Sequence, residues 1–147
     1  DLVELIDYVI KTYEKILSKN KIKLIFNKID NCKIIGDRDK LIEIFTNLID
    51  NSIKYSDKNK EIIITAKKDG DLIIISVADQ GIGIPKESIH RITERFFTVD
   101  PSKSRSVGGT GLGLAIVKHL VSQHRAEMNI NSIENQGTTI DIKFNSL

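Results

Sequence analysis

The stretch DRDKLIEIFTNLIDNSIKY, residues 37–55, predicts a long helix with two different faces. Its apolar residues recur at offsets of three and four, which is the spacing of one helical face packed on a core. They are Leu41, Ile44, Phe45, Leu48, Ile49 and Ile53. A polar stripe runs beside them at offsets of four, four and three, and it consists of Glu43, Asn47, Asn51 and Lys54.

The two asparagines in this stripe are unusual, because an asparagine side chain competes for backbone hydrogen bonds. Each costs a helix roughly a few tenths of a kcal/mol. A polar stripe is ordinarily the solvated side of a helix. The alternative is that the two asparagines have a binding role that offsets their cost to the helix. Amide oxygens of Asn47 and Asn51 suit a hard cation such as Mg²⁺, and Lys54 could neutralise the phosphates that such an ion binds.

Outward from this helix, the pattern predicts alternating helices and short strands. The expected helices are Asp1–Leu17, with Ile16 on its buried face, and about Leu112–His124. The expected strands are Lys23–Asn27, Cys32–Ile35, Ile62–Lys67, Leu72–Ala78, Met128–Ser132 and Thr139–Phe144. The strands Ile62–Lys67 and Leu72–Ala78 are separated by Asp69-Gly70-Asp71, as in a hairpin.

The segment Asp79–Gly113 holds six glycines and both prolines, and it predicts a long functional loop with a short helix inside. It opens with Asp79-Gln80-Gly81-Ile82-Gly83-Ile84-Pro85, directly after an apolar strand. A carboxylate there could accept a hydrogen bond from an adenine amino group while glycines let the backbone approach the ring. An ordinary strand-to-loop turn is the other reading.

The same segment ends in Gly108-Gly109-Thr110-Gly111-Leu112-Gly113-Leu114, at the start of a helix. Glycines at a helix N-terminus leave backbone N–H groups free to point at an anion, which the helix dipole also favours. The sequence therefore predicts a phosphate cradle. It is not a Walker P-loop, because the Gly-Lys-Ser/Thr ending is missing.

In order and spacing, these elements resemble the N, G1 and G2 boxes of the histidine kinase catalytic domain, within the GHKL ATPase superfamily. The similarity is greatest to sensor kinases of the phosphate-regulon type. Residues 46–56 resemble the N box, Glu94-Arg95-Phe96-Phe97 the F box, and Gln136-Gly137-Thr138-Thr139 the last glycine box. The resemblance covers Asp37 to Thr139.

The resemblance implies a role for each matching residue. Asn51 supplies an oxygen to Mg²⁺, Asn47 lines the metal and phosphate site, and Lys54 contacts phosphate; these three form the catalytic set. Asp79 binds the adenine amino group. The remaining residues implied to hold ATP are Tyr55, Gly81, Gly83, Ile84, Arg105, Gly109, Thr110, Gly111, Leu112, Gly113 and Thr138.

The resemblance also implies an ATP lid from about Arg95 to Gly108, in which Arg105 is either a phosphate contact or an exposed solubilising residue. Thr98 stands where many relatives place an arginine that reaches toward phosphate. That phosphate contact is expected from Arg95, Lys103 or Arg105, or is missing. Thr93 replaces the usual aromatic of the F-box helix.

A further departure is His124-Arg125-Ala126, which replaces a His-Gly-Gly turn, and a different turn is expected because Arg125 lacks the freedom of glycine. No His-Glu-Leu-Arg-like phosphoacceptor segment occurs. His90, His119 and His124 are expected to be surface or packing residues.

Composition excludes several other classes. The 147 residues carry 22 basic and 20 acidic side chains without long runs, so a nucleic-acid partner is not expected. The single Cys32 fits a reducing compartment and is expected to be a half-buried strand residue. There is no signal peptide and no stretch long enough for a membrane helix. We expect a cytoplasmic domain, residues 1–147, cut from a longer protein in the bacterial inner membrane.

Taken together, the sequence predicts an α/β (α+β) two-layer sandwich of the Bergerat type, with a mixed sheet of about five strands on three main helices. The implied activity is ATP and Mg²⁺ binding, and transfer of the γ-phosphoryl group to a histidine of a separate domain, for relay to a response regulator. The fragment is expected to be monomeric and unable to autophosphorylate alone, and the full protein to be a homodimer.

Three alternatives stay open. A GHKL hydrolase would need a glutamate near the first N-box position, where Asn47 stands and Glu43 lies one turn earlier. A serine kinase acting as an anti-sigma factor shares the boxes. A nucleotide-sensing module that has lost catalysis is suggested by Thr93 and Thr98.

Overall fold

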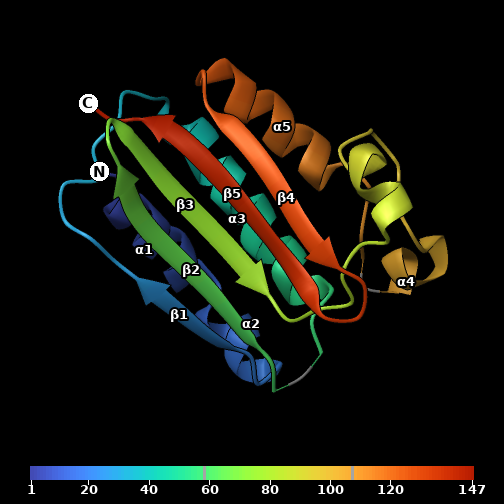
Figure 1. Cartoon of the computed structure of the whole chain (residues 1–147). Helices are drawn as coiled ribbons and strands as arrows, with labels where there is room; N and C mark the ends of the chain where they lie inside the picture. The colour runs from blue at the N-terminus through green and yellow to red at the C-terminus, as the bar shows by residue number, and fades with distance from the viewer. Residues whose placement is uncertain (58, 107) are drawn as a thin grey trace.

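The computed structural model describes residues 1–57, 59–106 and 108–147, the side chain of Lys103 excepted. Five strands form one mixed sheet in the order β1-β2-β3-β5-β4, and the long helices cover one face of it (Figure 1). The strands are β1 (Lys23–Asn27), β2 (Glu61–Asp69), β3 (Leu72–Asp79), β4 (Glu127–Ile133) and β5 (Gly137–Asn145). Only β1 and β2 pair in parallel. The predicted two-layer sandwich is therefore confirmed.

The helical layer consists of α1 (Leu2–Thr12), α2 (Glu14–Lys19), α3 (Arg38–Lys54) and α5 (Gly113–Gln123). Two short helical segments, η1 (Lys86–Arg91) and α4 (Pro101–Ser106), lie in the long loop where one had been predicted. The apolar face of α3 packs on the inward side chains of the sheet, and the rings of Phe45 and Phe144 lie 6.4 Å apart between centroids. This core fixes the position of the polar stripe on α3.

The single N-terminal helix predicted over residues 1–17 is interrupted at Tyr13, whose φ of −103° and ψ of 1° are not helical. The interruption rotates the second helix relative to the first. Leu17 is consequently buried, while Ile16, expected on the buried face, is 44% exposed.

The strand predicted at Cys32–Ile35 does not form. Instead the carbonyl oxygens of Cys32 and Lys33 accept single hydrogen bonds from the backbone N–H groups of Leu2 and Leu147. These contacts hold the segment between the two ends of the chain, where no strand runs alongside it. Cys32 is fully buried, contrary to the expectation of a half-buried strand residue.

The end of α5 is joined to the start of α3 through His124. Its Nδ1 lies 2.8 Å from the Leu120 carbonyl oxygen, and its Nε2 accepts the N–H of Asp37 at 3.1 Å, so the proton sits on Nδ1. His124 is thus a packing residue, as predicted. The turn after it was predicted wrongly, because Arg125 adopts the left-handed conformation at φ 53° that a glycine would take.

Candidate nucleotide site

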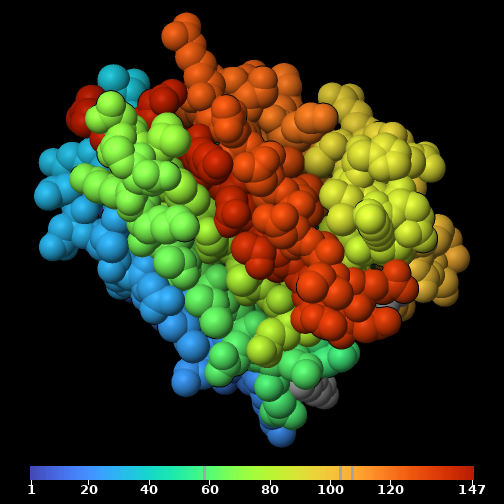
Figure 2. Space-filling model, in the orientation of Figure 1, coloured from blue at the N-terminus to red at the C-terminus, as the bar shows by residue number. Residues whose placement is uncertain are grey.

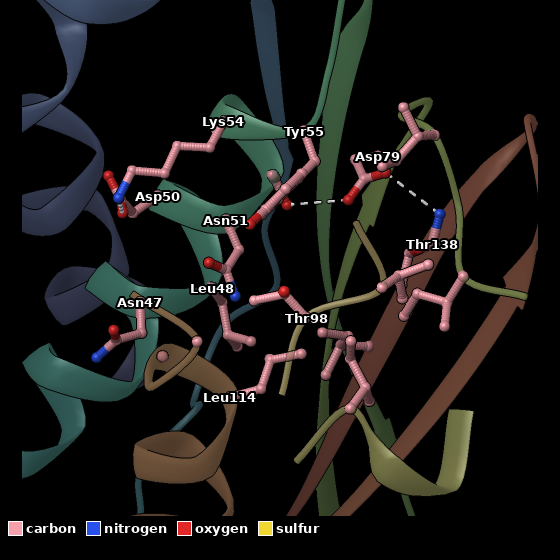
Figure 3. Close-up of a pocket in the computed structure, with 18 of the residues that line it drawn as sticks. Asn47, Leu48, Asp50, Asn51, Lys54, Tyr55, Asp79, Thr98, Leu114 and Thr138 are labelled. Atoms are coloured by element: carbon pink, nitrogen blue, oxygen red, sulfur yellow. Dashed lines mark hydrogen bonds and ion pairs between the residues drawn. The ribbon is translucent and has the colours of Figure 1, made fainter. Parts of the chain in front are cut away.

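The predicted site residues gather at one end of the sandwich, around a pocket of about 150 Å³ (Figure 3). The C-terminal half of α3, the end of β3, the start of β5 and the start of α5 meet there. Because β3 and β5 are antiparallel, Asp79 at the end of β3 lies beside Thr138 at the start of β5. The predicted residues that line the pocket are Asn47, Asn51, Lys54, Tyr55, Asp79, Gly83, Ile84, Thr110, Gly111, Gly113 and Thr138.

Asp79 is held by three donors from three separate elements. One carboxylate oxygen accepts from the backbone N–H groups of Gly81 at 2.9 Å and Thr138 at 3.2 Å, and the other accepts from Ser52 Oγ at 3.3 Å. Burial raises the pKa of Asp79, although these hydrogen bonds oppose the shift. The arrangement fixes a buried acceptor at the pocket wall, suited to an amino group of a ligand.

The glycines after Asp79 serve the protein's own packing. A Cβ on Gly81 would lie 2.4 Å from the Tyr55 carbonyl oxygen, and a Cβ on Gly83 would lie 2.2 Å from the Ile133 carbonyl oxygen. Gly83 also has a φ of 68°. The loop is therefore pressed between the end of α3 and the β4–β5 hairpin, and Gly81 itself does not line the pocket.

The two asparagines of α3 face the first residue of α5. A Cβ on Gly113 would meet Asn47 Oδ1 at 3.3 Å and both amide atoms of Asn51 at 3.4 Å. Asn47 Nδ2 donates to the Glu43 carbonyl oxygen at 2.9 Å, which leaves its Oδ1 as the acceptor. Among the described residues, no side chain caps the N-terminus of α5. Amide oxygens and backbone donors thus lie next to each other at this corner of the pocket.

Lys54 and Tyr55 connect the end of α3 to the loop before α5. Lys54 Nζ makes an ion pair of 2.8 Å with Asp50 and lies 3.4 Å from the Gly108 carbonyl oxygen. Figure 3 shows the lysine side chain turned toward Asp50 and away from Asp79. Tyr55 donates to Ser104 Oγ, in the buried part of α4, at 3.4 Å.

The glycine-rich loop before α5 contacts the backbone of Phe96, whose side chain is 74% exposed. The N–H of Phe96 donates to the Gly111 carbonyl oxygen at 2.8 Å, and a Cβ on Gly111 would lie 2.9 Å from Phe96 Cα. Thr110 Oγ1 accepts the N–H of Leu112 at 3.2 Å. The F-box phenylalanine and the predicted phosphate cradle therefore hold each other in place.

Four predicted nucleotide contacts do not line the pocket: Gly81, Arg105, Gly109 and Leu112. Arg105 is exposed on α4, and Leu112 is the residue preceding α5. Thr98 does line the pocket, but its short side chain cannot replace the reach of an arginine. Of the other two cations considered for that contact, Arg95 is exposed and does not line the pocket, and the side chain of Lys103 lies outside the described residues.

Two groups of lining residues were missed. Ser52 is a buried hydroxyl within the apolar face of α3, and that single polar residue among Leu48, Ile49 and Ile53 was the available signal. Phe97 and Val99 close the pocket from the loop, together with Ile92. Nothing in their sequence pattern separates them from ordinary packing residues.

The pocket is small for a nucleotide. Ligand sites usually enclose about 300 Å³ or more, whereas this one holds about 150 Å³. All four residues of the segment Phe97–Asp100 line the pocket, so this loop forms one of its walls.

A buried carboxylate, an asparagine stripe and an uncapped, glycine-led helix around one pocket of an α/β sandwich define a nucleotide-binding domain. The chain belongs to the family described as Histidine kinase-, DNA gyrase B-, and HSP90-like ATPase, whose model matches residues 36–146.

Named relatives agree with this family. The chain is 42% identical over 106 residues to sensor histidine kinase WalK of Bacillus subtilis, which is 71% of this chain and 17% of that protein. It is 42% identical over 109 residues to phosphate regulon sensor protein PhoR of Pseudomonas aeruginosa, 74% of this chain and 25% of that protein. The chain thus matches a quarter or less of the length of these two relatives.

Solved structures share the whole fold. The nucleotide-free catalytic domain of histidine kinase ThkA covers 99% of this chain and is itself covered to 93%, at 27% identity and a TM-score of 0.86. Full-length ShkA in complex with AMPPNP covers 100% of this chain, with 31% of that chain matched, at 25% identity and a TM-score of 0.83. In the described part of this chain, no helix has the length and apolar character needed to span a bilayer.

Proposed function

We propose that this chain is the ATP-binding catalytic domain of a two-component sensor histidine kinase. It binds Mg-ATP and donates the γ-phosphoryl group to a histidine of a dimerisation domain, for relay to an aspartate of a response regulator. One observation carries the proposal: Asp79, the Asn47–Asn51 pair, Gly113 and Thr138, distant in sequence, surround one pocket. The AMPPNP-bound ShkA structure and the sensor-kinase relatives support it.

In this proposal Asp79 accepts a hydrogen bond from the adenine amino group, and the start of α5 receives the phosphates through its backbone N–H groups. Asn51, with Asn47 beside it, offers the amide oxygens that would hold Mg²⁺, which adds charge neutralisation when bound. No group of three or more His, Cys, Asp or Glu side chains within the described residues could hold a metal. Phosphate oxygens of the nucleotide, together with water, would complete the coordination of the ion.

The residues of this chain contribute by positioning. Lys54 lies on the same corner as Asn51 and can exchange its ion pair with Asp50 for a phosphate. The apolar residues of the loop exclude water from the pocket, which strengthens the electrostatic contacts inside it. Orientation and charge neutralisation of the γ-phosphoryl group account for catalysis of this kind.

Calorimetric titration with ADP and with a nonhydrolysable ATP analogue, with and without Mg²⁺, tests the nucleotide site. Wild type should bind in the micromolar range. Asp79→Asn should lose about tenfold or more in affinity, because hydrogen bonds to charged groups are worth about 1.5–3 kcal/mol. Asn51→Ala should lose the Mg²⁺ dependence. A folded wild-type chain that binds no nucleotide would overturn the proposal.

A second experiment separates a kinase from the alternatives. A supplied dimerisation domain bearing a phosphoacceptor histidine should become phosphorylated by this chain and ATP. Phosphate release without that domain would identify a hydrolase. Glu43, the carboxylate considered for activating water, is exposed and does not line the pocket. Asp50 does line the pocket, but it is ion-paired with Lys54. The position of Glu43 therefore gives no support to a hydrolase.

A further inference from the structure

A second hollow, of about 630 Å³, opens where η1, α5 and the edge strand β4 meet. It shares no lining residue with the nucleotide pocket. Figure 2 shows η1 and β4 side by side on this face of the molecule. We call this hollow the β4 groove and define its floor by Val121, Met128 and Ile130 and its rim by His90, Lys118 and Arg125.

The floor of the β4 groove consists of apolar side chains. Those of β4 stay partly exposed because β4 is the last strand of the sheet. Met128 and Ile130 point to the inner side, where they pack against the core but stay partly exposed. Val121 of α5 completes the floor. An apolar strip bordered by polar residues is typical of a surface that a partner covers.

The rim of the groove carries two cations. Lys118 and Arg125 are exposed, as is His90, and among the described residues no Asp or Glu lines the groove. Within the described part of the chain, neither Lys118 nor Arg125 forms an ion pair. The rim cations are therefore available to an acidic partner, whose charges would steer and orient it.

Arg125 is held on this rim in an unfavourable backbone conformation. It follows α5 at φ 53°, and the N–H of Ala126 closes the helix end on the Val121 carbonyl oxygen at 3.1 Å. Glycine is the residue that normally ends a helix in this way. An arginine there places a long cation over the groove at a conformational cost, and such costs concentrate at functional positions.

Two of the departures that the family resemblance implies also line this groove. Thr93, in place of an aromatic residue, lines it together with Arg125 and Ala126, in place of two glycines. None of these three residues lines the nucleotide pocket, whereas Thr98 does.

We propose that the β4 groove docks a segment of a partner protein with one apolar and one acidic face. The apolar face covers Met128 and Ile130 above the buried Val121, and carboxylates of the segment pair with Lys118 and Arg125. This recognition goes beyond nucleotide binding and does not require it.

The test uses two synthetic amphipathic helices, one of leucine and glutamate and one in which lysine replaces every glutamate. Each is titrated into the isotope-labelled chain and followed by amide chemical shifts. The glutamate peptide should shift resonances of η1, β4 and the C-terminal half of α5. The lysine peptide should bind about tenfold more weakly or not at all. Equal binding of both peptides, or shifts confined to other surfaces, would refute the docking site.

Arg125→Gly gives a variant that cannot fail for lack of folding, since glycine adopts φ 53° freely. Its melting temperature should equal or exceed that of wild type, while its affinity for the glutamate peptide should fall about threefold or more. Lys11→Gln, an exposed change on α1 that also removes one positive charge, is the matched charge control and should leave peptide binding unaltered. Unchanged affinity in Arg125→Gly would contradict the role of the rim.

Discussion

Tyr55 at the end of α3 donates a hydrogen bond of 3.4 Å to Ser104, which is only 3% exposed in α4. This contact joins the helix that carries the asparagine stripe to the loop that closes the pocket. Gly109 fits the same junction, because its Cβ would lie 2.5 Å from Ser104 Oγ. The loop is therefore held against the end of α3 by a specific hydroxyl pair as well as by apolar packing.

Removal of this hydroxyl pair should speed nucleotide entry. In Ser104→Ala the hydrogen bond is lost, and a bond of this kind is worth about 0.5–1.5 kcal/mol, which corresponds to a rate increase of about threefold to tenfold. Stopped-flow fluorescence with a labelled ADP measures the association rate constant. Ser102→Ala, on the exposed side of the same short helix, is the control. Identical rate constants for wild type and Ser104→Ala would exclude a holding role for this contact.

Gly83→Ala should destabilise the fold severely. The new Cβ would meet the Ile133 carbonyl oxygen at 2.2 Å, at a φ of 68°. We expect a loss of about 3 kcal/mol or more in the free energy of unfolding. Gly70→Ala is the matched control, because its φ is 59° but nothing lies within 4 Å of the added Cβ. It should cost only about 1 kcal/mol. Urea denaturation of both variants measures the difference, and equal losses would show that crowding at Gly83 is unimportant.

Asp79→Asn should raise stability at neutral pH while it weakens nucleotide binding. Burial raises the pKa of Asp79 above its ordinary value of 3.8. An acid with a raised pKa contributes stability that is present below 3.8 and is lost as the pH rises through the raised value. The asparagine variant avoids that loss. Urea denaturation should therefore show the variant as the more stable protein at pH 7 and the two as similar at pH 3.

The same carboxyl should make nucleotide binding depend on pH. Protonation of Asp79 removes the acceptor for the adenine amino group, so the affinity of wild type for ADP should fall on acidification, beginning above pH 3.8. Asp79→Asn should bind weakly at every pH tested. Calorimetry across this range separates the two proteins, and parallel pH profiles would assign the titration to another group.

Tyr13 should make the stability of the fold depend on pH in the alkaline range. Burial, with Asp50 nearby, raises the pKa of Tyr13 from 10.0 to about 12. The stability that this raised pKa provides is complete below pH 10 and is lost between pH 10 and about 12. Tyr13→Phe should lack this loss. Denaturant unfolding at pH 9 and pH 11 should therefore show a steeper decline for wild type, and equal declines would argue against burial of the phenol.

The residue patterns predicted the parts of the fold that are periodic. The helix Arg38–Lys54 and the hairpin strands Glu61–Asp69 and Leu72–Asp79 follow directly from apolar spacing. The break at Tyr13 has no glycine or proline to announce it. The segment Cys32–Ile35 has the composition of a strand, but its backbone hydrogen bonds go to the chain ends, which local sequence does not encode.

The site residues also divide into those that the sequence reveals and those that only tertiary contacts reveal. Asp79, Asn51 and Gly113 could be found from the sequence because their residue types are unusual for their positions. Ser52 was missed, since its role depends on the tertiary contact with Asp79. The glycines Gly81 and Gly83 were attributed to ligand approach, whereas they admit neighbouring backbone in the folded chain. Close approaches of this kind are properties of the packed structure.

The parallel pairing of β1 with β2 has a consequence for the order in which the chain folds. The β2–β3 hairpin closes over a tight turn, an event of microseconds, whereas Lys23 reaches Glu61 only after the whole of α3 has been brought across. Loop-closure entropy therefore delays β1. We expect the first strand to join after the hairpin has closed, so that a refolding chain leaves the free edge of β2 open to intermolecular pairing until that step is complete.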